Sequence, residues 1–265
     1  MVTFATFLLV LLLLGYAGLS GLDLGACLLL RRLGRDAAER DVVLGAVLPY
    51  FLANEVWLVL SVGFAAGAFP GLEKTTISPL YPVLMLLLFG WLVRDLGLWL
   101  RGRVDRAGWR GFWDRAIVAG AWTVVAAWGL TLGNVLRGTP EGTAPLALFT
   151  PFPLLCAVFT LSTVAGYGAW YTRRRLRGEP GARAAALASR LRWAGLAAAI
   201  PALVWGLVGG DLLAGGPPLT ASVAAENSLR LVVVATVVLL PLLAAAQLVV
   251  WRTFRGPVDR VVANL

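Results

Sequence analysis

Residues 15–57 read GYAGLSGLDLGACLLLRRLGRDAAERDVVLGAVLPYFLANEVW, and this stretch decides the fold. Two apolar segments are joined by a short charged loop, and each segment carries one acidic residue, Asp23 in the first and Glu55 in the second. A charged side chain at the centre of a membrane-spanning helix costs roughly 2.5–3.5 kcal/mol on insertion scales. These two acids are therefore the first candidates for function in the chain.

The whole chain has the composition of an integral membrane protein. Of its 265 residues, 59% are hydrophobic and 14% are charged, and a soluble domain of this size would expose too much apolar surface. The net charge of +9 does not indicate nucleic-acid binding, because the basic residues lie in short loops between apolar segments. We expect a single transmembrane domain over residues 1–265.

Seven stretches are long and apolar enough to cross a ~30 Å hydrocarbon core as helices. The predicted spans are 4–30, 42–69, 79–100, 116–136, 151–171, 191–210 and 229–251. The first stretch lacks a basic start and a clear cleavage site, so we interpret it as a retained span and not as a signal peptide. The fold class that follows is an all-α integral membrane protein of about seven transmembrane helices.

Arginines mark one side of the predicted membrane domain. Four lie in the loop 31–41, five in 101–115, seven in 172–192 and three, including Arg260, in the tail, whereas the opposite loops hold Lys74 and Arg137. The positive-inside rule predicts an N-terminus outside and a C-terminus in the cytoplasm. The loop 172–192 is expected to contact anionic lipids, and its Ala-rich part 181–192 to extend the sixth helix into the cytoplasm.

Helical spacing gives the first segment two faces. Tyr16, Ser20, Asp23 and Cys27 fall on one stripe, and Gly18, Gly21 and Gly25 fall roughly opposite. Small residues let another helix approach closely, so the polar stripe is expected to face protein or water and not lipid. The residues leave a second interpretation, in which Asp23 only forms a hydrogen bond between helices.

In the second segment, Glu55 lies 14 residues after Asp41, which is about 21 Å along one continuous helix and near the middle of the membrane. Pro49 is expected to kink this helix. A protonated Glu55 that merely hydrogen-bonds a neighbour is the alternative. At the end of the third span, Arg94 and Asp95 adjoin the cytoplasmic boundary, where snorkelling to the interface is one interpretation and a functional role for Arg94 is the other.

These motifs resemble subunit II of the cytochrome bd-type quinol oxidases. That family has a G-F-D-M-G-like motif in its first helix, matched by residues 21–25, and a Glu–Arg pair, matched by Glu39 and Arg40. Its P-H-W-D-G-N-Q-V-W-like motif is matched by residues 49–57. A W-R-x-x-W-D motif is matched by residues 109–114, in which Asp114 is expected to pair with Arg110.

The resemblance covers residues 1–210. We interpret residues 211–265 as a divergent and shortened part, with one helical hairpin fewer than the nine spans of typical members. The resemblance implies an arrangement based on four-helix bundles, in the bacterial cytoplasmic membrane. It further implies a non-haem subunit of an oxidase that oxidises quinol and reduces O2 to water.

The resemblance also implies the partners and cofactors. A haem-bearing subunit I would carry haems b and d or variants of them, and a structural quinone and a small accessory subunit are compatible with the family. The chain itself contains no histidine, and its only methionines are Met1 and Met85. We therefore expect no catalytic residue, haem ligand or metal site in this chain.

This sequence alters the family's proton-uptake motif, because Tyr50 and Leu52 replace its histidine and aspartate and Glu55 stands where glutamine is common. We hypothesise a rearranged proton relay. Its members are Asp23, Glu55, Ser20, Asn54, Tyr50 and Arg94. Two alternatives are a purely structural membrane partner that moves no protons and a small-solute transporter whose binding site holds the two acids.

Overall fold

The computed structural model describes residues 1–139, 145–209 and 219–258. Arg260 and residues 211–218 of the segment interpreted above as divergent lie outside the described residues. The helices of the first half are α1 (Val2–Leu33), α2 (Ala37–Gly45), α3 (Leu48–Ala68), η1 (Glu73–Ile77), α4 (Tyr81–Leu100), η2 (Arg101–Arg103) and α5 (Ala107–Leu136). Those of the second half are η3 (Pro145–Phe149), α6 (Pro151–Arg175), α7 (Gly178–Leu191), α8 (Ala194–Val208) and α9 (Glu226–Phe254).

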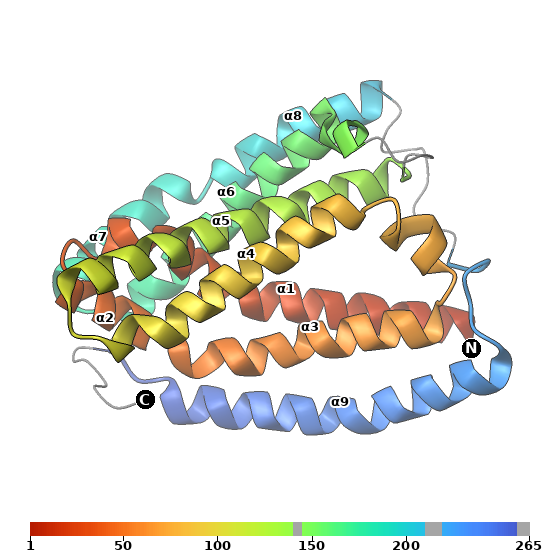
Figure 1. Cartoon of the computed structure of the whole chain (residues 1–265), viewed down its shortest axis with the longest axis horizontal. Coiled ribbons are helices and arrows are strands. Elements are labelled where there is room, and N and C mark those ends of the chain that lie inside the picture. The colour runs from red at the N-terminus through yellow and green to blue at the C-terminus, as the bar shows by residue number, and fades with distance from the viewer. Residues whose placement is uncertain (140–144, 210–218, 259–265) are drawn as a thin grey trace.

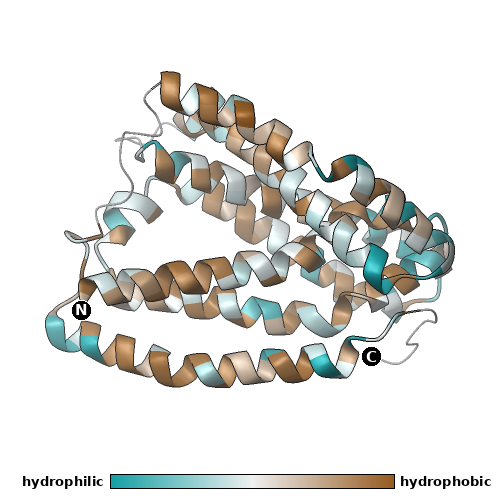
Figure 2. Cartoon of the chain, turned by 180° about the vertical axis from the view of Figure 1, so that it is seen from behind, coloured by the Kyte–Doolittle hydropathy of each residue, from teal (hydrophilic) through white to brown (hydrophobic). Residues whose placement is uncertain are grey.

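Seven helical segments of the described chain are long and apolar enough to cross a membrane, which confirms the predicted number of spans. They correspond to α1, α3, α4 with η2, α5, α6, α7 with α8, and α9. Their outward surfaces are apolar, as Figure 2 shows for α8 and α9. Hydrophilic residues gather at the end that holds α2, α7 and the C-terminus. The protein is therefore an all-α multi-pass membrane protein.

The second span is not the continuous helix that the sequence predicted. The carboxylate of Asp36 accepts a hydrogen bond from the backbone N–H of Glu39 at 2.8 Å, which starts α2 as a separate short helix. Pro49 lies in the first turn of α3, where its missing N–H leaves no bond unmade. Pro49 thus begins a helix and does not kink one, and the distance expected between Asp41 and Glu55 does not apply.

The sixth span is also divided, because α7 and α8 are separated by a turn at Arg192 and Trp193. The prediction that residues 181–192 continue the sixth helix is therefore wrong. Instead, Arg183 of α7 lies 2.5 Å from the carboxylate of Glu39 in α2. The hydrogen bond from Arg183 lowers the pKa of Glu39. This pair holds α7 against α2.

Helix α1 lies at the centre of the bundle, packed along α3, α5 and α6, while α9 packs along α3 (Figure 1). The α1–α6 contact depends on glycine, since a Cβ at Gly25 would lie 2.7 Å from the backbone of Gly168. The predicted small-residue face is therefore correct at Gly25. It is wrong at Gly18, where an added Cβ would meet no neighbouring atom of the described residues within 4 Å.

We predict opposite effects for alanine at these two glycines. Gly25→Ala should lower the stability of the chain by about 1–3 kcal/mol, because the backbones of α1 and α6 must move apart. Gly18→Ala is the matched control and should be neutral or stabilising by up to about 1 kcal/mol, because its Cβ meets open space. Thermal unfolding in detergent measures both, and equal midpoints would contradict the close packing.

Candidate functional site

The guanidinium of Arg94 is the centre of a buried ionic cluster between α1, α3 and α4. Its Nη1 donates to the Asp23 carboxylate at 3.1 Å, its Nη2 donates to the Glu55 carboxylate, and its Nε donates to Asp95 at 2.7 Å. Arg94 is only 1% exposed. The predicted snorkelling of Arg94 is therefore wrong, because carboxylates inside the protein pair its charge.

A close helix contact on α4 and a buried face of α1 place these side chains. Gly120 of α5 packs against the backbone of α4, and a Cβ there would lie 2.6 Å from the backbone N of Arg94. This contact fixes the turn of α4 from which Arg94 reaches toward α1. On α1, the stripe predicted from helical spacing is buried along its whole length, namely Tyr16, Ser20, Asp23 and Cys27.

The charge balance of the cluster determines what it can do chemically. Three carboxyl groups share one guanidinium, so full ionisation would leave an excess of negative charge in a low-dielectric site, which is costly. Binding of a proton to one of the three carboxyl groups would remove part of that excess charge. The arrangement is therefore compatible with a site that holds a proton.

Uncharged hydrogen-bond donors also contact the two acids, Asp23 and Glu55. Asn54 Nδ2 donates to Asp23 Oδ1 at 3.0 Å, and Trp91 Nε1 donates to Glu55 Oε1 at 3.1 Å. The Asn54 oxygen in turn accepts from Gln247 Nε2 at 2.9 Å. A continuous series of polar groups thus runs from α9 through α3 and α1 to α4.

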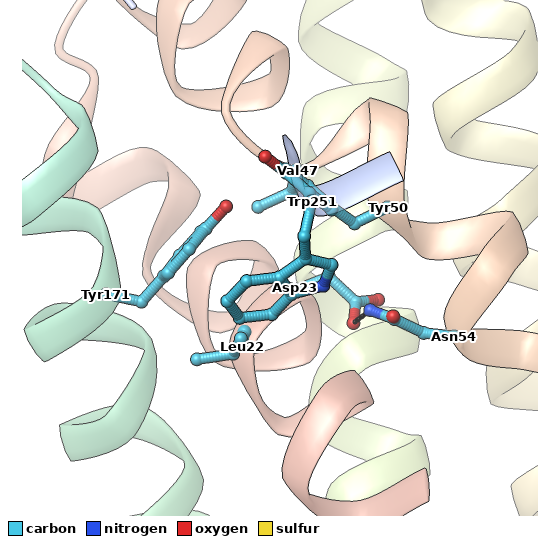
Figure 3. A pocket seen from close by; sticks show the side chains of 7 residues that line it. All are labelled: Leu22, Asp23, Val47, Tyr50, Asn54, Tyr171 and Trp251. Carbon is cyan, nitrogen blue, oxygen red and sulfur yellow. Dashed lines mark hydrogen bonds between the residues drawn. The ribbon is translucent and has the colours of Figure 1, made fainter. Parts of the chain in front are cut away.

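A narrow pocket lies beside Asp23, between α1, α3, α6 and α9 (Figure 3). It is lined by Leu22, Asp23, Val47, Tyr50, Asn54, Tyr171 and Trp251. Figure 3 shows the Asp23 carboxylate and the Asn54 amide pointing toward one another. The pocket therefore leads from Asp23 toward the beginning of α3, at the arginine-rich end of the molecule.

Tyr50 lies at that end of the pocket, and its hydroxyl bonds to groups other than the two acids. Its hydroxyl donates to the Phe254 carbonyl at 2.6 Å and accepts from Arg175 Nη1 at 2.8 Å. Ser20 is buried one turn before Asp23 on α1. The structure thus joins Asp23, Glu55, Asn54 and Arg94 in one cluster and places Tyr50 and Ser20 beside it.

Sequence reasoning missed three members of this site. Asp95 was assigned to the interface together with Arg94, although an acid next to a buried arginine is a direct ion-pair candidate. Trp91 donates to Glu55 from one turn earlier on α4. Gln247, a polar residue in the otherwise apolar α9, was the visible signal that α9 meets Asn54.

A second ionic network lies at the arginine-rich end of the helices. Arg101 donates to Asp114 at 2.5 Å and to Asp41, and Arg40 lies 3.1 Å from Asp114. Arg110 pairs with Asp41 at 3.2 Å. The predicted Asp114–Arg110 pair is therefore wrong, because Asp114 faces α2 and η2 and not the exposed side of its own helix.

The residues present do not fit a haem. The chain has no histidine, Met85 is exposed on α4, and both cysteines are buried in the packing of their helices. Among the described residues, no group of three or more histidine, cysteine or acidic side chains is placed to hold a metal ion. No step of the chemistry is therefore assigned to a group held by this chain.

Comparison with known proteins places the chain in a family. The family model described as cytochrome bd terminal oxidase subunit II matches residues 1–225. The chain belongs to the cytochrome bd terminal oxidase subunit II family. The match includes every member of the ionic cluster, whereas the whole of α9, with Gln247, lies beyond it.

Individual relatives agree with this assignment. The chain is 30% identical over 210 residues to "Cytochrome bd-I ubiquinol oxidase subunit 2" of Escherichia coli K12, which covers 76% of the chain and 55% of that protein. It is 31% identical over 172 residues to "Probable cytochrome oxidase subunit 2" of Haemophilus influenzae, covering 61% of the chain and 46% of the relative. The matches thus span about half the length of these relatives.

We predict that Arg94→Gln destabilises the chain by about 3–5 kcal/mol, because it leaves buried carboxylates without a cation. Arg103→Gln removes an exposed arginine just beyond the same helix and is the control. Combining Arg94→Gln with Asp23→Asn and Glu55→Gln should recover part of the loss. Thermal unfolding in detergent gives the comparison, and an Arg94→Gln chain as stable as its parent would contradict the ion-pair geometry.

Proposed function

We propose that this chain is the non-haem subunit II of a cytochrome bd-type terminal oxidase that oxidises quinol and reduces O2 to water. The family match over residues 1–225 is the observation that carries this proposal. Its relatives in Haemophilus influenzae, Escherichia coli and Bacillus subtilis are oxidase subunits of bacteria, which supports the bacterial cytoplasmic membrane as its location. The haems, the quinol site and the site of O2 reduction belong to the partner subunit I.

The first role that we propose for the chain is to stabilise the haem-bearing subunit. Exposed large hydrophobic side chains lie along its outer helices, so a membrane partner can pack on these stretches without desolvating charges. The edge of the ionic cluster favours such a partner as well. The side chains of Glu55 and Asp95 are 11% and 16% exposed, and lipid is a poor neighbour for an acid.

The second role is proton delivery, because the reduction of oxygen to water consumes protons. In the proposed route, a proton enters at the arginine-rich end, passes Tyr50 and reaches Asp23 through water molecules, for which the narrow pocket must widen. It then passes from the Asp23 carboxyl group to the Glu55 carboxylate, while Arg94 holds the two acids next to one another and keeps its own protons. The positive-inside rule makes the arginine-rich end cytoplasmic, with the N-terminus outside.

Further partners belong to the same proposal. Exposed Arg173, Arg174 and Arg190 lie at the arginine-rich end of α6 and on α7, a short helix with charged and Ala-rich faces. This pattern suits anionic lipid headgroups. A structural quinone and a small accessory subunit are proposed only at the level of the complex.

We predict that a haem-bearing membrane protein co-purifies with the tagged chain when it is expressed in its native host. The preparation should show haem absorption in the visible spectrum, and separation of the subunits should leave the haem with the partner. An unrelated multi-pass membrane protein carrying the same tag is the control for haem proteins that co-purify only because they share detergent micelles. A chain that purifies alone and monodisperse, with no chromoprotein beside it, would refute the subunit assignment.

We predict that Asp23→Asn and Glu55→Gln each lower quinol oxidase turnover of the assembled complex by about a hundredfold, because each removes a proton-carrying group. Asp105→Asn is the matched control, since its side chain is 95% exposed outside the cluster. Oxygen consumption and haem content are measured on the same preparations. Full turnover with normal assembly in both variants would contradict the proton route and leave the chain with a structural role only.

A further inference from the structure

Gln247 of α9 is buried against the cluster although it lies outside the part of the chain that matches the family model. It is 7% exposed and donates from Nε2 to the Asn54 oxygen at 2.9 Å. Asn54 then donates from Nδ2 to Asp23 at 3.0 Å. Gln247 is thus two hydrogen bonds away from the acid at which the proposed proton route begins.

The direction of these hydrogen bonds is fixed by the backbone. Asn54 Nδ2 also donates to the carbonyl of Leu19 at 3.1 Å, and a carbonyl oxygen can only accept. The Asn54 amide nitrogen must therefore face α1 and Asp23, which leaves its oxygen toward α9. Only a donor can satisfy that oxygen, and Gln247 supplies it.

The attachment of α9 does not require Gln247. At its beginning, the backbone N–H of Ala224 donates to the Ala68 carbonyl at 3.0 Å. At its end, Tyr50 donates to the Phe254 carbonyl and the N–H of Val258 donates to the Arg175 carbonyl at 2.8 Å. Contacts at both ends thus hold α9 in place. We infer that the Gln247–Asn54 hydrogen bond between them has another purpose.

The cost of Gln247 supports the same view. Its Oε1 is buried and has no hydrogen-bond partner among the described residues. A buried acceptor without a partner is destabilising. This cost at Gln247 accompanies the one function that an apolar side chain could not perform, which is to donate a hydrogen bond to the Asn54 oxygen.

We propose that Gln247 is a positioning residue for proton transfer, acting through Asn54 to keep an N–H donor on Asp23. The inference rests on the proposed proton route. With Gln247 in place, Asp23 is held between Asn54 and Arg94 in one orientation. Without it, the Asn54 side chain is free to rotate, and Asp23 loses a fixed donor on the side of the pocket.

The test compares two α9 variants in the intact oxidase complex. Gln247→Met keeps an unbranched side chain of similar length and removes the donor. Thr236→Val removes a buried hydroxyl from the same helix, three turns earlier and away from the cluster, and is the matched control. The measurements are kcat and KM for quinol, the solvent isotope effect on kcat, and the thermal unfolding midpoint.

We expect Gln247→Met to lower kcat by about three- to tenfold, as the loss of one hydrogen bond predicts, with KM unchanged. The solvent isotope effect should rise, because proton transfer becomes more strongly rate-limiting, and the unfolding midpoint should fall modestly, because the buried Asn54 oxygen loses its donor. In an Asn54→Leu background, Gln247→Met should cause no further loss, since the connection is already cut.

Three results would overturn the inference. An unchanged kcat in Gln247→Met would show that Gln247 has no effect on turnover. An equal loss in the Asn54→Leu background shows that Gln247 acts independently of Asn54, and a lowered unfolding midpoint with an unchanged isotope effect shows a structural role. Failure of the proposed function is a different result, in which Asp23→Asn retains full turnover, and it removes the basis of this inference too.

Discussion

The shared guanidinium of Arg94 is the interaction on which the rest of the site depends. Asp23 comes from α1, Glu55 from α3, and Asp95 from α4 itself, and the three acids meet only through this one cation. The backbones of α3 and α4 make no extensive contact with each other, and Figure 1 shows them diverging from the end that holds α2. The ion pairs thus join two helices that packing does not join.

This arrangement explains how a membrane helix can carry an acid near its middle. Desolvating a carboxylate costs several kcal/mol, and only a close cation with further hydrogen bonds can offset that cost. Asp23 has both, from Arg94 and Asn54. An equal number of cations and acids would make the cluster a static ion pair. The excess of carboxyl groups over guanidinium groups makes it a site at which protons can bind and leave.

The second network, around Arg101 and Asp114, shows the contrast. Its acids are matched by Arg40, Arg101 and Arg110, and it joins α2, η2 and α5 at the arginine-rich end of the helices. Three cations and two acids leave no excess of carboxyl groups, and such a network suits a structural role. The two ionic sites thus use the same residue types in opposite charge ratios.

The sequence was sufficient to predict the seven spans, the buried stripe of α1 and the cluster's principal acids, because hydropathy and helical spacing are local properties. It could not predict which partner each charge would choose. Arg94 was assigned to the interface and Asp114 to Arg110, since sequence distance suggests neighbours within one helix. The true partners come from helices that only the tertiary packing brings together. Pro49 was misjudged for a related reason, since α2 ends at Gly45 and the chain turns at Ala46 and Val47, so that the proline falls in the first turn of a new helix.

The most direct measurement is a cryo-electron microscopy structure of the oxidase complex that contains this chain, at a resolution that separates side chains. Our account predicts the Arg94 guanidinium between the carboxyl groups of Asp23 and Glu55, with the Glu55–Asp95 edge covered by the haem-bearing subunit. An Arg94 side chain that extends to the membrane surface, with Asp23 and Glu55 apart, would contradict it.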